Sequence, residues 1–268
     1  MKIKVLVENT SCDKNLKGQH GLSLYIETGH SKILFDSGAN DLFLKNAKKL
    51  GVDISAVDYF VLSHGHYDHG GGLKGFIKAN SKAKILISKY AFGGYFAKVH
   101  FFKKYIGLDK KLKNHPRIVF VDKEFKIDDD MVIFSDITGS KYRSAKSKLL
   151  KYENGNIMPD DFNHEQCLII NDVLFAGCSH TGIVNIYEKA KNYGEIKYIF
   201  GGLHLYNPST KKSEDETLVA DIANFFRDKN VKIYTGHCTG KRSFEVLHSI
   251  LGEKIEEIST GKMYEISD

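Results

Sequence analysis

One short segment, Val61-Leu-Ser-His-Gly-His-Tyr-Asp-His-Gly-Gly-Gly-Leu73, constrains this chain more than any other. It follows an apolar run, residues 57–62, that is typical of a buried strand. Three imidazoles and one carboxylate on a loop suit a borderline-soft divalent cation such as zinc. Side chains two apart in extended backbone point to the same side, and the glycines allow sharp turns close to an ion. The ligand-type residues are His64, His66, Asp68 and His69.

A histidine-rich surface loop is the alternative interpretation of this segment. Any one histidine, taken alone, is usually structural or solvated. Four ligand-type residues at this spacing after a strand favour a metal centre, in which His64 and His66 serve one ion. Asp68 and His69 follow on a turn and can serve a second ion close by.

The string His64-Gly-His-Tyr-Asp-His69 resembles the His-x-His-x-Asp-His signature of the metallo-β-lactamase-fold superfamily. The longer string, residues 62–73, is similar to one subgroup of metal-dependent hydrolases. That subgroup includes proteins labelled 7,8-dihydropterin-6-methyl-4-(β-D-ribofuranosyl)aminobenzene-5′-phosphate synthase. The resemblance runs from the first predicted strand to the last turn. It implies an α/β (α+β) fold, a four-layer αββα sandwich of two mixed β-sheets flanked by helices.

The apolar patterning agrees with that fold class. Strands come first and then alternate with helices, twice over, which predicts two sheets packed face to face with helices outside. With no repeat and no Pro/Ser-rich linker, we expect a single domain over residues 1–268. The predicted helices cover residues 42–50, 73–79, 182–193, 213–227 and 243–251, and Asp41 can cap the first of them. The predicted strands cover residues 3–8, 22–27, 32–35, 57–62, 84–88, 117–121, 131–134, 167–171, 173–178, 197–201, 232–235 and 255–259.

Two further segments carry less regular patterns. Residues 90–105 are rich in Phe and Tyr, which fits an aromatic cap over the site, a dimer surface or a core-facing irregular helix. Residues 136–163 are polar and irregular, as functional lids often are. We expect both segments to shape the substrate pocket. The cations of the second segment are Lys141, Arg143, Lys146 and Lys148.

The loop cannot complete two metal sites alone, so later strand ends must supply further ligands. The motifs Gly177-Cys-Ser-His180 and Gly236-His-Cys-Thr-Gly240 each follow an apolar strand and resemble subgroup and superfamily motifs. The resemblance implies that His180 joins His64 and His66, whereas His237 joins Asp68 and His69. His164, which precedes a predicted strand, competes with His180 for the third-ligand position.

Three other residues have two interpretations each. Most superfamily members place a bridging aspartate where this chain has Cys178, which can bridge as a thiolate or be a small buried residue. We interpret His204 as a substrate-facing donor or proton carrier, with a structural loop histidine as the alternative. Asp36 can support the metal loop from below, as the resemblance implies, or simply form a turn.

Composition limits the classes of molecule that we expect the protein to bind. The formal charge of +6 permits an anionic small-molecule substrate, but no basic tract is dense enough to predict nucleic-acid binding. Four scattered cysteines without a CxxC motif indicate a reducing compartment. No signal peptide and no apolar run of membrane-spanning length is present, so we expect a cytoplasmic protein without a membrane partner. A homo-oligomer is compatible with these features.

The pattern favours a metal-dependent hydrolase that uses a metal-activated water on a phosphoester or ester. We expect two zinc ions, with manganese or iron as alternatives. Asp68 is placed to accept a hydrogen bond from the nucleophile and to shuttle a proton. The first alternative is a transferase like the subgroup's synthase, acting on phosphoribosyl diphosphate. The second is a non-catalytic metal-binding sensor.

Overall fold

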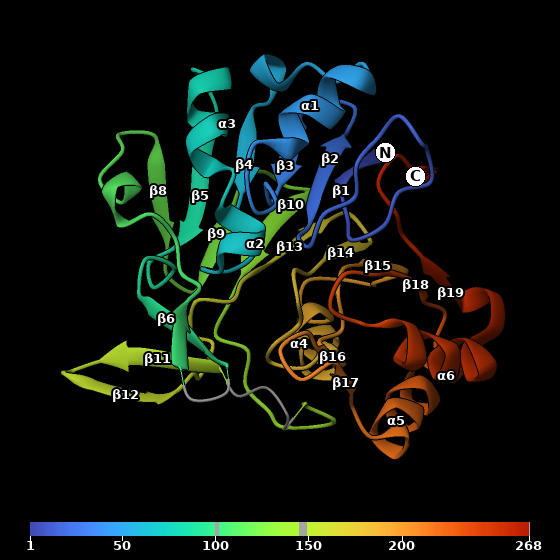
Figure 1. Ribbon diagram of the computed structural model, residues 1–268. Helices are drawn as coiled ribbons and strands as arrows, with labels where there is room; N and C mark the ends of the chain where they lie inside the picture. The colour runs from blue at the N-terminus through green and yellow to red at the C-terminus, as the bar shows by residue number, and fades with distance from the viewer. Residues whose placement is uncertain (100–101, 145–148, 268) are drawn as a thin grey trace. The chain divides into compact units, whose positions relative to one another are not determined.

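The computed structural model describes residues 1–99, 102–144 and 149–267, which group into two compact units (Figure 1). Lys146 and Lys148, and residues 100–101 of the aromatic segment, lie outside the described residues. The first unit comprises Met1–Tyr95, Ile106–Asp122 and Ile258–Asp268. The second unit comprises Phe96–Tyr105 and Lys123–Glu257.

The first unit is built on a mixed sheet with the strand order β20-β1-β2-β3-β4-β5-β8. From β20 to β3 the neighbours are antiparallel, and from β3 to β8 they are parallel. The parallel strands are rich in buried apolar residues, as strands covered on both faces are. The strands are β1 (Lys2–Val7), β2 (Ser23–Glu27), β3 (Lys32–Phe35), β4 (Tyr59–Val61), β5 (Lys84–Ser88), β8 (Ile118–Val121) and β20 (Met263–Glu265).

Helices α1 (Leu42–Lys49) and α3 (Leu73–Ala79) lie along this first sheet (Figure 1). Their buried side chains join the strand residues in one apolar core, in which the rings of Phe60 and Phe76 lie 4.8 Å apart. Between β4 and α3 the chain forms a single helical turn, α2 (Tyr67–Gly70). Short 3₁₀ turns, η1 (Ile54–Ala56) and η2 (Lys110–Leu112), complete the unit.

The second unit repeats the same sheet pattern in the order β9-β10-β13-β14-β15-β18-β19. From β9 to β14 the neighbours are antiparallel, and from β14 to β19 they are parallel. Side chains from the parallel strands and three helices form its apolar core. The strands are β9 (Glu124–Lys126), β10 (Met131–Phe134), β13 (Cys167–Ile170), β14 (Val173–Phe175), β15 (Tyr198–Phe200), β18 (Lys232–Thr235) and β19 (Ile255–Glu257).

The three helices of the second unit are α4 (Ile183–Ala190), α5 (Glu216–Arg227) and α6 (Lys241–Leu251), the last followed by η3 (Gly252–Lys254). Asp215 caps α5 by accepting a hydrogen bond from the Thr217 amide at 2.9 Å. Two small sheets complete the described structure. They pair β12-β11-β6-β7 and β16-β17, with bounds β6 (Gly94–Val99), β7 (Phe102–Tyr105), β11 (Leu149–Glu153), β12 (Asn156–Pro159), β16 (Tyr206–Asn207) and β17 (Lys212–Ser213).

The structure corrects three predictions. Residues 90–105 do not form an irregular helix, because they contain β6 and β7. The segment 136–163 is less irregular than predicted, since β11 and β12 form a hairpin in it. Asp41 makes no side-chain cap of α1, because the neighbouring Asn40 carboxamide oxygen accepts the Leu42 amide at 2.9 Å. Strands β9, β16, β17 and β20 were not predicted.

The remaining predicted helices and strands are present with small shifts at their ends, and five of them, β3, β5, β10, β18 and α3, have the predicted bounds. Each unit therefore has a mixed sheet flanked by helices, as expected. The single domain over 1–268 stays a prediction. Within the described ranges, no helix combines the length and apolar character needed to cross a bilayer.

Candidate metal centre

The predicted metal loop of the first unit gathers its imidazoles tightly. The ring of His64 lies 4.6 Å from that of His66 and 4.1 Å from that of His69, centroid to centroid. All three rings are buried. The loop leaves the carboxyl end of β4, and α2 then places Asp68 and His69 one turn further on.

Asp36, at the end of β3, supports this loop from below. Its carboxylate accepts hydrogen bonds from the Ser63 amide and hydroxyl, both at 2.7 Å, and contacts the Nδ1 atom of His69 at 2.6 Å. With Nδ1 held in this way, His69 presents Nε2 as its ligand atom. That Nε2 atom lies 3.9 Å from an Asp68 carboxylate oxygen, a separation that one ion can bridge. The donor set of the loop therefore fits a divalent metal.

His20 contributes to the same region, although its sequence context gave no reason to single it out. Its Nε2 atom lies 3.2 Å from the Asp68 carboxylate, and its side chain is 41% exposed. The next residue, Gly21, has a φ of +142°, and a Cβ there would lie 2.5 Å from the Asp68 carbonyl oxygen. Only the folded chain brings this loop, residues 18–21, beside α2.

The second unit places its candidate residues after three adjacent parallel strands. Cys178 and His180 follow β14, His204 follows β15, and His237 follows β18. Because parallel strands end at one edge of a sheet, these side chains gather there. The rings of His180 and His204 lie 4.2 Å apart, centroid to centroid, with an interplanar angle of 61°. His204 and His237 have φ values of +52° and +51°, an uncommon backbone conformation for residues other than glycine.

His180 is held by two residues that the sequence analysis did not assign. The carboxylate of Glu165 accepts the amides of His180 and Thr181, at 2.7 and 2.8 Å, and the Thr181 hydroxyl at 2.6 Å. The ring of Phe162 stacks on the His180 imidazole at 4.4 Å with an interplanar angle of 2°. Glu165 stands next to His164 in sequence, and an acidic residue between a candidate ligand and an apolar strand is the signal that could have found it.

His164, the competing ligand candidate, is buried with its Nε2 atom 3.1 Å from the Asp160 carboxylate. This contact gives it a carboxylate partner within the second unit.

Two thiols lie beside His204. The ligand atoms of Cys178, His204 and Cys238 are all within 4.8 Å of one another, and the Cys238 sulfur accepts the His204 amide at 3.3 Å. Burial raises the pKa of the Cys238 thiol. The hydrogen bonds with Cys178 and His204 and the charges of His237 and His204 outweigh that effect, so the pKa lies well below its ordinary value.

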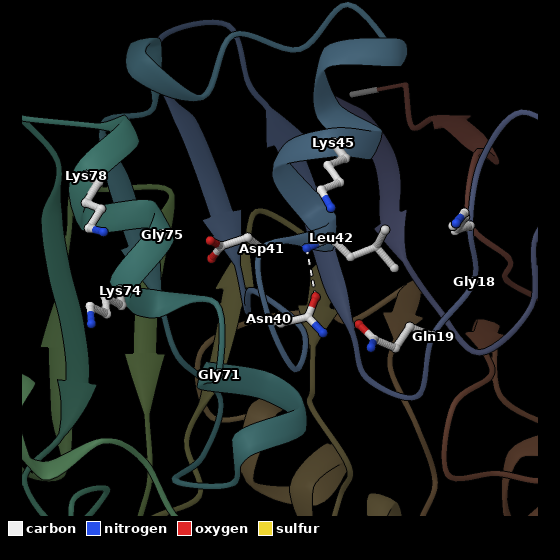
Figure 2. A pocket seen from close by; sticks show the side chains of 11 residues that line it. Gly18, Gln19, Asn40, Asp41, Leu42, Lys45, Gly71, Lys74, Gly75 and Lys78 are labelled. Atoms are coloured by element: carbon white, nitrogen blue, oxygen red, sulfur yellow. Dashed lines mark hydrogen bonds between the residues drawn. The ribbon is translucent and has the colours of Figure 1, made fainter.

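A groove of about 720 Å³ opens elsewhere on the first unit, between α1, α3 and the loop at residues 17–19 (Figure 2). Its lining includes Lys17, Lys45, Lys74 and Lys78. None of the predicted metal ligands lines it, although Gly71 in its wall directly follows α2. We therefore do not assign the chemistry to this groove.

The structure thus brings His64, His66, Asp68 and His69 together in the first unit, and His180 and His204 together in the second. The full ligand set, which draws on both units, stays a prediction.

Comparison with known proteins agrees with these observations. The sequence model of the metallo-beta-lactamase superfamily matches residues 16–141. The chain is 33% identical to MJ0448, an uncharacterised protein of Methanocaldococcus jannaschii, over 92% of this chain and 94% of that protein. It is 29% identical to a protein of the same organism named 7,8-dihydropterin-6-methyl-4-(beta-D-ribofuranosyl)-aminobenzene-5'-phosphate synthase, over 91% of this chain and 89% of that protein.

Among solved structures, the chain is similar to the crystal structure of Tm1679, described as a metal-dependent hydrolase of the beta-lactamase superfamily. The TM-score is 0.84 with 28% identity, and both chains are covered completely. The predicted fold class, mixed sheets flanked by helices, is thereby confirmed. From its sequence, its fold and these relatives, the chain belongs to the metallo-β-lactamase superfamily.

Proposed function

We propose that this protein is a metal-dependent hydrolase that acts on a small phosphoester or ester. The observation that carries the proposal is the arrangement of Asp36, His69 and Asp68, in which a buried carboxylate orients one imidazole toward a second carboxylate. Such a carboxylate–histidine pair is the usual support of a metal-binding imidazole. The similarity to Tm1679, a metal-dependent hydrolase, supports the same activity.

The proposed metal ligands are the six residues that the sequence motifs single out. This set rests on the motifs and on superfamily membership, and zinc suits its nitrogen-rich donors. When bound, divalent ions supply Lewis acidity and lower the pKa of water toward neutrality. We propose two ions per chain. Their ligands are His64, His66, Asp68, His69, His180 and His237.

Asp68 and His204 have proposed catalytic roles, and His20 assists Asp68. Asp68 accepts a proton from the attacking water, and His20, 3.2 Å from its carboxylate and partly exposed, connects it to solvent. His204 donates a hydrogen bond to the substrate. Its half-buried ring beside His180 supports that role.

A transferase of the synthase type is the second candidate. The observation that favours it is the 29% identity, over most of both chains, to the relative that carries the synthase name. Turnover of phosphoribosyl diphosphate with an aromatic acid would favour the transferase. Cleavage of generic phosphodiesters or esters would favour the hydrolase.

The deciding experiment is elemental analysis of metal per chain in the wild-type protein and in the His66→Ala and His237→Ala variants. The proposal predicts about two ions per chain, with fewer in both variants. An exposed histidine of the first unit, changed as His30→Ala, serves as the matched control and should keep the wild-type content.

One ion that is lost in His66→Ala but kept in His237→Ala would mean that only the first site is occupied. That result would contradict the proposal of two ions per chain. A metal-replete preparation with no bound metal would contradict the catalytic proposal as a whole.

A further inference from the structure

The segment before residue 145 is pinned to the start of α4. The buried Asn185 side chain accepts the Lys141 amide at 3.1 Å and donates to the Lys141 carbonyl, also at 3.1 Å. The same Asn185 amide group donates to the Thr181 carbonyl at 2.8 Å. The backbone at Lys141 is therefore fixed beside the start of α4, although this segment has no regular secondary structure.

Arg143 extends from this pinned segment onto the His180 loop. Its Nε–H group donates to the His180 carbonyl oxygen at 3.1 Å. Its guanidinium carbon lies 5.2 Å from the centre of the Phe162 ring, which in turn stacks on the His180 imidazole. The guanidinium is thus held by a hydrogen bond on one side and by an aromatic face on the other.

The outer fork of this guanidinium consists of its Nη1 and Nη2 groups. Within the described ranges, Arg143 has no carboxylate partner, and its Nη1 and Nη2 atoms make no hydrogen bond. By contrast, Arg242 on α6, an exposed arginine of the same unit, pairs with Glu216 and Glu245. A half-buried arginine with two donor nitrogens, Nη1 and Nη2, in a rigid fork matches the geometry of a planar or tetrahedral oxyanion.

We propose that Arg143 is the receptor for an anionic group of the substrate, a phosphate or a carboxylate, and that it holds this group beside the His180 loop. The inference rests on the proposed function to the extent that His180 is a proposed ligand. It narrows the substrate class to compounds that carry an anionic oxygen group. Because its Nε atom and its aromatic contact already fix the side chain, little rotamer entropy is lost on binding.

The test is calorimetric binding of inorganic phosphate and of acetate to the metal-loaded protein, which requires no turnover. In Arg143→Gln we expect phosphate binding to weaken by roughly 10- to 100-fold, the effect of losing one or two charge-assisted hydrogen bonds. Arg143→Lys keeps the charge without the fork and should recover part of the loss. Preferential loss of phosphate or of acetate binding identifies which oxyanion the fork prefers.

The matched control is Lys141→Gln, which removes a cation from the same segment. The Lys141 ammonium lies over the Phe225 ring at 4.8 Å, so phosphate affinity should stay within about twofold of wild type. Equal losses of phosphate affinity in both variants would indicate that binding depends only on the general positive charge of the segment. That result would overturn the proposed receptor role of Arg143. The receptor role would also be overturned if Arg143→Gln bound phosphate with wild-type affinity, or if the wild-type protein showed no saturable anion binding.

Metal content is measured on every variant. Loss of metal in Arg143→Gln would show that Arg143 acts only by positioning His180, and it would overturn the receptor role. If the wild-type protein binds phosphate through Arg143 yet hydrolyses no ester, the hydrolase proposal fails while this inference stands.

Discussion

The two units each use one buried carboxylate to hold a candidate ligand loop, but they hold the imidazole differently. In the first unit Asp36 contacts the ring of His69 itself, at 2.6 Å. In the second unit Glu165 accepts only the backbone amides of His180 and Thr181 and the Thr181 hydroxyl. The His180 ring itself contacts the rings of Phe162 and His204.

The two units differ in this way although their large sheets share one topology. In both, three antiparallel pairs are followed by three parallel pairs, and the candidate residues follow the parallel strands. The first unit concentrates its residues on one loop after β4, whereas the second distributes them after β14, β15 and β18. In the first unit, where the candidate residues follow one strand, a carboxylate contacts the His69 ring. In the second unit, where they follow three strands, an aromatic ring stacks on His180.

The largest effect is expected from Asp36→Ala. The change leaves the His69 Nδ1 group and the Ser63 hydroxyl buried without their carboxylate, which should cost about 3–5 kcal/mol of unfolding free energy. Urea denaturation and metal analysis measure the loss. Asp109→Ala, which removes an exposed acceptor of the Lys111 amide, is the control and should cost about 1 kcal/mol. Equal costs in the two variants would contradict the supporting role of Asp36.

Glu165→Gln tests the support in the second unit. The amide keeps one acceptor oxygen but turns an NH₂ group toward buried donors, so we expect a loss of about 2–3 kcal/mol. Glu188→Gln on α4, whose partner is the exposed Lys191, should change stability by less than about 1 kcal/mol. If Glu165→Gln unfolds at the wild-type urea concentration, the parallel with Asp36 fails.

Phe162→Leu should separate ring orientation from backbone support. Loss of the stack on His180 is expected to cost about 1 kcal/mol, with metal affinity lowered roughly 3- to 10-fold in competition with a chelator. Phe134→Leu removes a ring stacked on Tyr193 in the same unit and should reduce stability without changing metal affinity. A metal affinity that falls equally in both variants would show that the Phe162 stack has no specific role.

The smallest effect is expected from His20→Gln in the first unit. The His20 side chain is partly exposed, so its contact with Asp68 is screened, and kcat/KM for an ester should fall only about two- to fivefold. His30→Gln, an exposed histidine of the β2–β3 turn, serves as the control. A loss of a hundredfold or more would instead make His20 part of the catalytic centre.

Local sequence patterns predicted most of the fold. Strands such as β3 and β5, and helix α3, have the predicted bounds because their apolar runs are short and end at turn residues. An irregular helix was one interpretation of the aromatic segment at 90–105, but Phe and Tyr favour strands, and the pairing of β6 with β7 decided the outcome. Likewise the capping role of Asp41 went to Asn40, because either side chain can accept an amide at a helix start.

The sequence by itself determined the superfamily signature, the concentrated ligand loop and the motifs that contain His180 and His237, because these depend on residue type and spacing along the chain. The tertiary structure decided which distant residues act on them. Glu165, Phe162 and Arg143 reach His180 from 15 to 37 residues away. Such contacts depend on strand order and loop packing, and neither of these produces a periodic pattern in the sequence. For that reason the supports of each imidazole, and the arginine fork beside one of them, became visible only in the folded chain.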